Sequence, residues 1–146
     1  MELSDEAIYN KVKDDLIRYA TVLVGPTDAE DVVSTVILRT LQRRPLSDLD
    51  EPRPYLFRAV LNEARGLHRR RPVVRPPQSD VAMDDHADDS VMNALRGLPD
   101  RQRAAIYLVY WEDLTISDAA DAMGARPGTV KRYLHLARKN LRGALQ

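Results

Sequence analysis

The stretch with the clearest chemistry in this sequence spans residues 114–138. Apolar residues recur at helical spacing on both sides of Gly124, and Val130, Leu134 and Ala137 form the i, i+4, i+7 stripe of the second helix. A glycine between them can adopt the positive φ that a tight turn between helices requires. The spacing therefore predicts a helix-turn-helix, whose second helix typically enters the DNA major groove.

The second of these helices is also predicted to be basic. Pro127 suits a first helical position, and residues 126–142 contain basic side chains but no acidic one. The cations on its outer face include Lys131, Arg132 and Arg138. The alternative is a helical hairpin with a merely solvated basic face. The agreement of hairpin, turn glycine and one-sided charge favours DNA binding.

A second basic helix is predicted over residues 53–70, after a loop that contains three prolines, and Pro72 is expected to stop it. Its polar side carries six arginines but only one acidic residue, Glu63. The arginines are Arg53, Arg58, Arg65, Arg69, Arg70 and Arg71. Arginines near a helix C-terminus complement the helix dipole, which accounts for residues 69–71 but not for the other three. We therefore expect a nucleic-acid surface here as well.

The composition excludes several classes of protein. The 22 basic and 22 acidic residues cancel, and cysteine is absent, so disulfides and thiolate chemistry are excluded. No apolar run approaches the roughly 20 residues of a membrane span, and the acidic N-terminus is unlike a signal peptide. The three histidines are scattered and there is no glycine-rich phosphate loop. We expect a cytoplasmic protein that is not an enzyme and has no metal site or cofactor.

The chain is predicted to be all-α, with two small helical domains. Residues 1–71 form the first and residues 90–146 the second, a four-helix unit with the helix-turn-helix. Residues 72–89, rich in proline and then in aspartate, form the linker between them. Ser4 is the expected N-cap of the first helix, and a capping box over residues 27–30 is expected to begin the second. A helix is expected from Pro99 to about Trp111, and its aromatic residues Tyr107, Tyr110 and Trp111 are expected in the core or hinge of the second domain.

Four segments in order resemble a known family. They are DAEDVV at 28–33, RPYLFRAVLN at 53–62, LPDRQR at 98–103 and GTVK at 128–131. Together they resemble the bacterial RNA polymerase sigma factors of the sigma-70 family, in the extracytoplasmic-function (ECF) group. The resemblance covers nearly the whole chain. It implies two promoter-recognising domains, called region two and region four, and transcription initiation at promoters with −10 and −35 elements.

The resemblance also implies a role for particular residues. The clamp helices of the polymerase's largest subunit would bind the outer face of the second helix, at Asp31, Ser34, Thr35, Leu38 and Arg39. The single-stranded −10 element would contact Leu46, Ser47, Asp48, Arg53, Arg58, Asn62 and Arg65. The duplex −35 element would contact Arg126, Thr129, Lys131, Arg132, Tyr133, His135 and Arg138. An anti-sigma protein is a further expected partner, and the acidic linker either mimics nucleic acid in the polymerase or is a solvated tether.

Two other functions fit parts of the sequence. A stand-alone helix-turn-helix regulator would bind a duplex palindrome as a dimer, but it leaves the basic helix at 53–70 unexplained. An adaptor with the same fold would bind another protein without initiating transcription.

The linker as a free coil would average about 23 Å end to end, well short of the roughly 60 Å between the two promoter elements. We therefore expect weak DNA binding by the free chain and specific binding with polymerase.

Overall fold

The computed structural model describes residues 4–71 and 93–145, and all regular structure in these ranges is helical. The predicted all-α class is confirmed. The elements are α1 (Asp5–Val24), α2 (Pro26–Arg43), the 3-10 turn η1 (Leu46–Asp48), α3 (Pro52–Arg70), α5 (Asp100–Ile106), the wider turn η2 (Tyr107–Trp111), α6 (Ile116–Met123) and α7 (Pro127–Leu145). The predicted linker at 72–89 lies outside the described residues.

Helices α1 and α2 begin for different local reasons. The Ser4 hydroxyl accepts a hydrogen bond from the Ala7 N–H at 3.1 Å, which confirms the predicted N-cap. The predicted capping box at residues 27–30 is wrong. Gly25 turns the chain with a φ of 91° and Pro26 begins the helix, so Thr27 already lies in the first turn.

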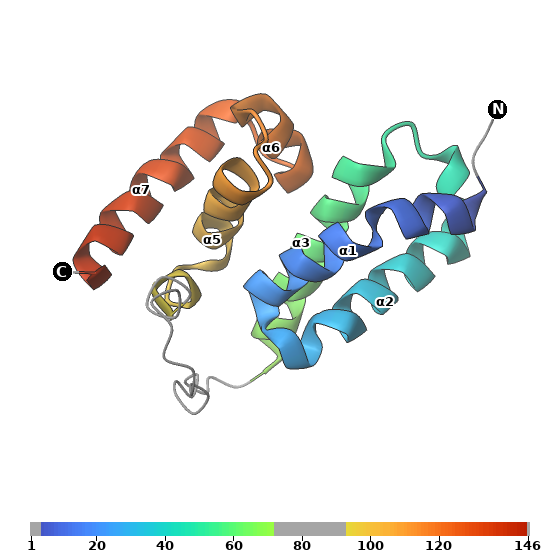
Figure 1. Cartoon of the computed structure of the whole chain (residues 1–146), viewed down its shortest axis with the longest axis horizontal. Coiled ribbons are helices and arrows are strands. Elements are labelled where there is room, and N and C mark those ends of the chain that lie inside the picture. Colours follow the sequence, from blue (N-terminus) through green and yellow to red (C-terminus); the bar gives the residue numbers. More distant parts are fainter. Residues whose placement is uncertain (1–3, 72–92, 146) are drawn as a thin grey trace.

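The first three helices form one bundle, in which α1 packs against both α2 and α3 (Figure 1). The loop between α2 and α3 is held to this bundle by Leu46 and Leu49, which are buried. Pro52 then begins α3. The loop and the start of α3 are therefore fixed in position by packing.

The C-terminal helices α5, α6 and α7 form the second bundle (Figure 1). Thr115 caps α6 through a hydrogen bond from the Asp118 N–H, and Gly124 ends α6 with a φ of 67°. The positive φ predicted for this turn is confirmed. The helix expected to continue to Trp111 instead changes at Tyr107 into the wider π-helical turn η2. Trp111 is 54% exposed.

The aromatic residues of η2 do not all belong to the core. Tyr107 is buried as expected, but Tyr110 and Trp111 are both more than half exposed. Neither ring lies in the core, because the wider turn directs only Tyr107 of the three inward. Tyr110 instead contacts the guanidinium of Arg138 on α7, whose Nη2 donates a hydrogen bond to the Tyr110 hydroxyl at 2.7 Å.

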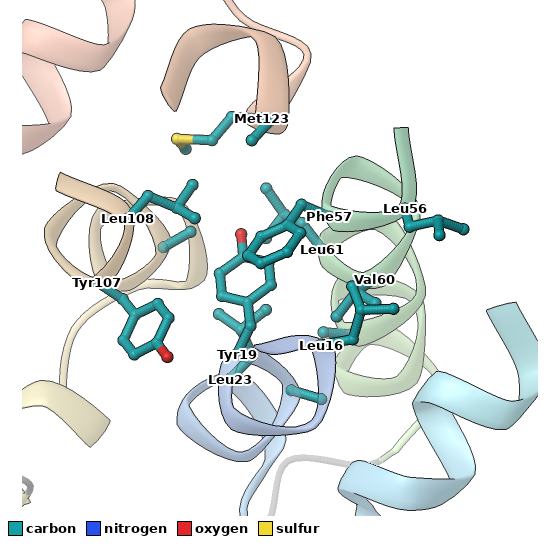
Figure 2. Close-up of a cluster of buried hydrophobic side chains, with 14 of the residues drawn as sticks. Leu16, Tyr19, Leu23, Leu56, Phe57, Val60, Leu61, Tyr107, Leu108 and Met123 are labelled. Carbon is teal, nitrogen blue, oxygen red and sulfur yellow. The ribbon is translucent and has the colours of Figure 1, made fainter. Parts of the chain in front are cut away.

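The two bundles share a continuous core. Tyr19 of α1 stacks on Phe57 of α3 at 4.9 Å between ring centroids, and on Tyr107 of η2 at 5.6 Å. Figure 2 shows these rings beside Leu108 and Met123 of the C-terminal half, which approach α1 and α3 from the other side. The N-terminal half (residues 4–71) and the C-terminal half (residues 93–145) are therefore packed together.

Candidate nucleic-acid interface

Helix α7 presents a cationic surface that faces away from the rest of the molecule. Lys131, His135 and Arg138 lie at i, i+4 and i+7 and are exposed, as is Arg132. The opposite side of the helix is anchored by Val130, which is fully buried. In the described part of the chain, no carboxylate forms an ion pair with these α7 cations. A polyanion can therefore approach this surface directly.

The turn before α7 forms a hollow of about 320 Å³. Its lining includes Arg126, Thr129 and Tyr133, three of the residues predicted to contact duplex DNA, and also Arg101 from α5. Arg126 is exposed, whereas Thr129 and Tyr133 are half-buried. The predicted duplex-contacting residues thus divide between this hollow and the exposed cationic stripe.

Helix α3 carries a second polar stripe. Arg58, Asn62, Arg65 and Arg69 follow one another at steps of four, three and four residues, so they share one side of the helix. Arg53 lies outside this stripe, because it precedes Arg58 by five residues and so projects from another side of the helix. The predicted single-strand contacts on α3 therefore do not form one continuous surface.

Part of the α3 stripe lines a groove of about 400 Å³ between α2 and α3. The lining is strongly basic, and its charged and polar members are Arg39, Thr40, Arg43, Tyr55, Arg58, Asn62, Glu63, Arg69 and Arg70. The Glu63 carboxylate bonds to both Arg39 and Arg70, at 2.8 and 3.2 Å. Arginines and an aromatic ring along a groove suit the backbone and bases of single-stranded nucleic acid.

Sequence reasoning did not assign Arg43 and Tyr55 to this groove. Tyr55 lines the groove and lies beneath the Arg44 guanidinium, which is 5.8 Å from the ring centroid. The available signal was the basic end of α2, at Arg43 and Arg44. Arg39, predicted to contact polymerase, also lines the groove.

The loop residues predicted to contact the single strand are in different environments. Leu46 is 1% exposed, so its side chain belongs to the core and is unavailable to a ligand. Ser47 is half-buried, and its N–H donates a hydrogen bond to Asp5 at 3.2 Å. Asp48 is exposed. The loop thus presents Ser47 and Asp48 to a ligand, while the buried Leu46 fixes the position of the loop.

The predicted polymerase contacts do share one outward face of α2. Asp31, Ser34, Leu38 and Arg39 are exposed and Thr35 is half-buried. Leu38 is 60% exposed, and Leu41 one turn further along is 40% exposed. Exposed leucines beside polar residues on one helix are typical of a protein-binding surface.

Arg53 and Arg58 are both engaged by the C-terminal half. Arg53 lies between Asp15 of α1 and Glu112, with its Nη2 2.9 Å from Glu112 Oε1. Arg58 Nη2 donates a hydrogen bond to the backbone carbonyl of Asp121 in α6 at 3.0 Å. Both side chains thus bond to other parts of the protein, while Arg58 stays exposed in the groove between α2 and α3.

Arg103 is a buried residue to which sequence reasoning gave no role. It is 8% exposed, and all its guanidinium nitrogens donate to backbone carbonyls; the acceptors are those of Val22, Leu23, Leu95, Arg96 and Leu98. Burial lowers the pKa of Arg103, while the charge of Asp100 opposes that shift. An arginine stays protonated even so. The available signal was a cation followed directly by the apolar run Ala104–Ile106.

Two further ionic contacts involve the end of α3. Arg71 donates to both carboxylate oxygens of Asp28 at 2.9 and 3.1 Å, and this hydrogen bonding lowers the pKa of Asp28. His68 Nδ1 lies 2.9 Å from an Asp100 oxygen in the C-terminal half. The basic end of α3 is therefore tied to α2 and to α5.

A helix-turn-helix with a basic second helix, beside a three-helix bundle with its own basic groove, defines the class of DNA-binding transcription proteins. The family model for sigma-70 region 4 matches residues 88–141. The RNA polymerase sigma-E factor of Streptomyces coelicolor is 35% identical over 143 residues, which are 91% of this chain and 81% of that protein. The ECF sigma factor SigL of Mycobacterium tuberculosis is 31% identical over 96% of this chain and 88% of its own. The chain belongs to the ECF group of RNA polymerase sigma factors.

Solved structures show the same fold. The sigma factor RpoE of Bartonella quintana, in complex with the anti-sigma factor NepR, superposes with a TM-score of 0.73 at 22% identity and covers 96% of this chain and 95% of its own. CnrH in complex with the cytosolic domain of CnrY superposes with a TM-score of 0.68 at 22% identity, covering 97% and 86%. Neither likeness assigns a role to an individual residue. Among the described helices, none is both long and apolar enough to cross a membrane.

Proposed function

We propose that this sigma factor directs core RNA polymerase to promoters through three surfaces. The outer face of α2 binds the clamp helices of the largest subunit, the loop and α3 bind the −10 element as a single strand, and α7 binds the −35 element as duplex. The polymerase supplies the catalysis, in the cytoplasm. The observation that carries the proposal is the 35% identity to a sigma-E factor across a chain with two separate basic helices.

The chemistry of each surface supports its assignment. Leu38 and Leu41 give α2 an exposed apolar strip that water does not favour. The groove between α2 and α3 combines arginines with Asn62, whose amide can donate to and accept from a base edge. Lys131 and Arg132 follow closely after the turn, where the N-terminal residues of such a helix contact bases.

We also propose an anti-sigma protein as a partner. Similar folds have been solved in complexes with the anti-sigma factor NepR and with the cytosolic domain of CnrY. The strip of Leu38 and Leu41 would suit an inhibitor as well as it suits polymerase, so such a protein would compete with polymerase for α2.

Run-off transcription with purified core polymerase on genomic promoter fragments tests this function. We expect defined transcripts that depend on the added chain. R58E and K131E should each reduce them strongly, because each reverses a charge that faces DNA in the proposal. K11E is the matched control, since Lys11 is exposed on α1, away from the three surfaces.

The alternatives give different results in the same assay. Absence of any transcript, together with no association with core polymerase, would exclude the sigma function. Strong sequence-specific binding to duplex DNA without polymerase would instead support the stand-alone regulator. Association with polymerase or another protein without any transcript would support the adaptor.

A further inference from the structure

We propose that Glu63 of α3 is a positioning residue, which holds Arg39 and Arg70 side by side so that both bind one backbone phosphate of the single strand. The proposal rests on the function proposed above, because all three residues line the groove between α2 and α3. It adds a phosphate site to that groove. It also assigns Arg39 to the strand surface in place of the polymerase surface.

The Glu63 carboxylate is shared by two arginines from different helices. Its Oε1 accepts a hydrogen bond from Arg39 Nη1 of α2 at 2.8 Å, and its Oε2 accepts one from Arg70 Nη2 of α3 at 3.2 Å. Because both guanidinium groups bond to one carboxylate, they lie next to each other. An arginine side chain otherwise samples many rotamers, so this contact fixes two cations before a ligand binds.

The two cations are exposed, whereas the anion is covered. The side chains of Arg39 and Arg70 are 65% and 58% exposed, but that of Glu63 is only 11% exposed. A guanidinium has five N–H donors, and the contact with Glu63 uses one nitrogen of each arginine. The remaining donors suit the oxygens of a phosphodiester. A phosphate at this position therefore meets two cations and is shielded from the carboxylate.

The charges of the three residues explain why two arginines are needed. Two cations and one anion leave a single net positive charge, which matches the single negative charge of a phosphodiester. Removal of either arginine leaves no net charge, so the phosphate should be released. Among the residues that line the groove, Glu63 is the one acidic side chain beside five arginines. Its place there is explained if it arranges two of them.

Gly66 supplies the space that Arg70 needs. Residues 63, 66 and 70 lie at i, i+3 and i+7, so the glycine is between the two charged residues on one side of α3. A Cβ added at Gly66 would lie 3.1 Å from Arg70 Nη1, closer than ordinary van der Waals contact. Glycine in a helix interior is less stable than alanine. Its presence here is therefore explained by the path of the Arg70 side chain to Glu63.

The alternative is an ion-pair cluster that only joins α2 to α3. Exposed ion pairs contribute little to stability, and α2 and α3 already pack directly on each other. The two interpretations differ in what a substitution changes. A structural cluster affects the stability of the chain, whereas a phosphate site affects strand binding and its salt dependence.

Binding of a fluorescent oligothymidylate of about 15 nucleotides to the full chain, followed by anisotropy over a salt series, tests the proposal. E63D keeps the charge but shortens the side chain, so it should not reach both arginines. It should weaken strand binding about threefold, whereas an effect of charge alone would leave the affinity unchanged. R39Q and R70Q should each weaken binding about fivefold. Each should also reduce the slope of log affinity against log salt concentration by about 0.7, the value for one phosphate of a single strand.

G66A distinguishes positioning from loss of folding. It should raise the urea midpoint, because alanine favours the helix. It should nevertheless weaken strand binding about twofold, because its Cβ displaces the Arg70 guanidinium. R96Q is the matched control, since Arg96 is also exposed and hydrogen-bonded but lies outside the groove. It should bind the strand like the parent.

Unchanged strand binding in either E63D or G66A would overturn the positioning role, and so would a loss in R96Q equal to that in R39Q. R39Q should associate with core polymerase like the parent. Loss of that association would return Arg39 to the polymerase surface and overturn the shared site. If the parent chain binds the strand but gives no transcript with core polymerase, the sigma function fails, while these variants still test the phosphate site.

Discussion

Helices α3 and α7 are both rich in arginine or lysine, but their charged side chains make different contacts. Arg53, Arg58 and Arg71 of the α3 segment contact acceptors on other elements, and Arg70 pairs with Glu63 of α3 itself. On α7, the described contacts of the cations include the Tyr110 ring under Arg138 but no carboxylate. Local charge is therefore a poor guide to the availability of a surface, because tertiary contacts decide which cations remain free.

The largest effect is expected from the residue that holds the halves together. R103M keeps the apolar stem but removes every hydrogen bond to the five carbonyls, so the free energy of unfolding should fall by about 3 kcal/mol. Urea denaturation followed by circular dichroism measures this. R101M on the same helix changes an exposed arginine and should stay within about 0.5 kcal/mol of the parent. Equal losses in the two variants would contradict the role of Arg103.

A smaller effect of opposite sign is expected at Tyr19. Y19F removes a buried hydroxyl that has no hydrogen-bond partner among the described residues, so it should stabilise the fold by about 1 kcal/mol. Burial also raises the pKa of Tyr19 above the ordinary value of 10.0. The stability that this shift contributes is present below that value and is lost as pH rises above it.

Thermal denaturation across pH 8 to about 11 should therefore show a steeper loss for the parent than for Y19F. Y9F is the control, because Tyr9 is on the same helix but only half-buried. It should match the parent in stability and pH profile. A destabilised Y19F would show that the hydroxyl has a partner after all.

On α7, removal of one free cation should weaken duplex binding uniformly. K131A should lower the affinity of the polymerase complex for a −35 duplex about fivefold. It should also reduce the slope of log affinity against log salt concentration by about 1. K139A, two turns further from the helix-turn-helix turn, should have less effect because base contacts gather at the start of the helix. Fluorescence anisotropy over a salt series distinguishes them, and equal losses would place the DNA elsewhere on α7.

The smallest effect is expected where a cation is already partnered. E112Q removes the anion beside Arg53 and should tighten single-strand binding of the free chain about two- to fivefold, the range of a partly exposed ion pair. D113N removes the same charge one residue later, at an exposed position, and should leave binding unchanged. Weaker binding by E112Q would mean that Glu112 supports the strand surface and does not compete with it.

Much of the fold was predictable because it depends on local sequence. The N-cap of α1 follows from Ser4, the turn before α7 from Gly124, and the stop of α3 from Pro72 after its last basic turn. The errors arose where a competing local signal was stronger. Gly25 and Pro26 began α2 before the expected capping box, and η2 widened where a regular helix was expected.

The candidate sites were predictable to a lesser degree. The outward face of α2 and the exposed cations of α7 follow from helical periodicity, and their exposure is confirmed. The burial of Leu46 and the place of Tyr55 in the basic groove depend on how α1, α2 and α3 pack. Periodicity assigns a residue to a side of its helix, but it does not identify the neighbour on that side.

The sequence alone determined the helices, the basic character of α3 and α7, and the resemblance to sigma factors, because these depend on residues close together in the chain. Only the tertiary structure decided that Arg103 completes the end of α1, about 80 residues away. It also decided that the C-terminal half bonds to Arg53 and Arg58. The physical reason is that a buried guanidinium bonds to whichever carbonyls packing brings within reach, and no local pattern specifies them.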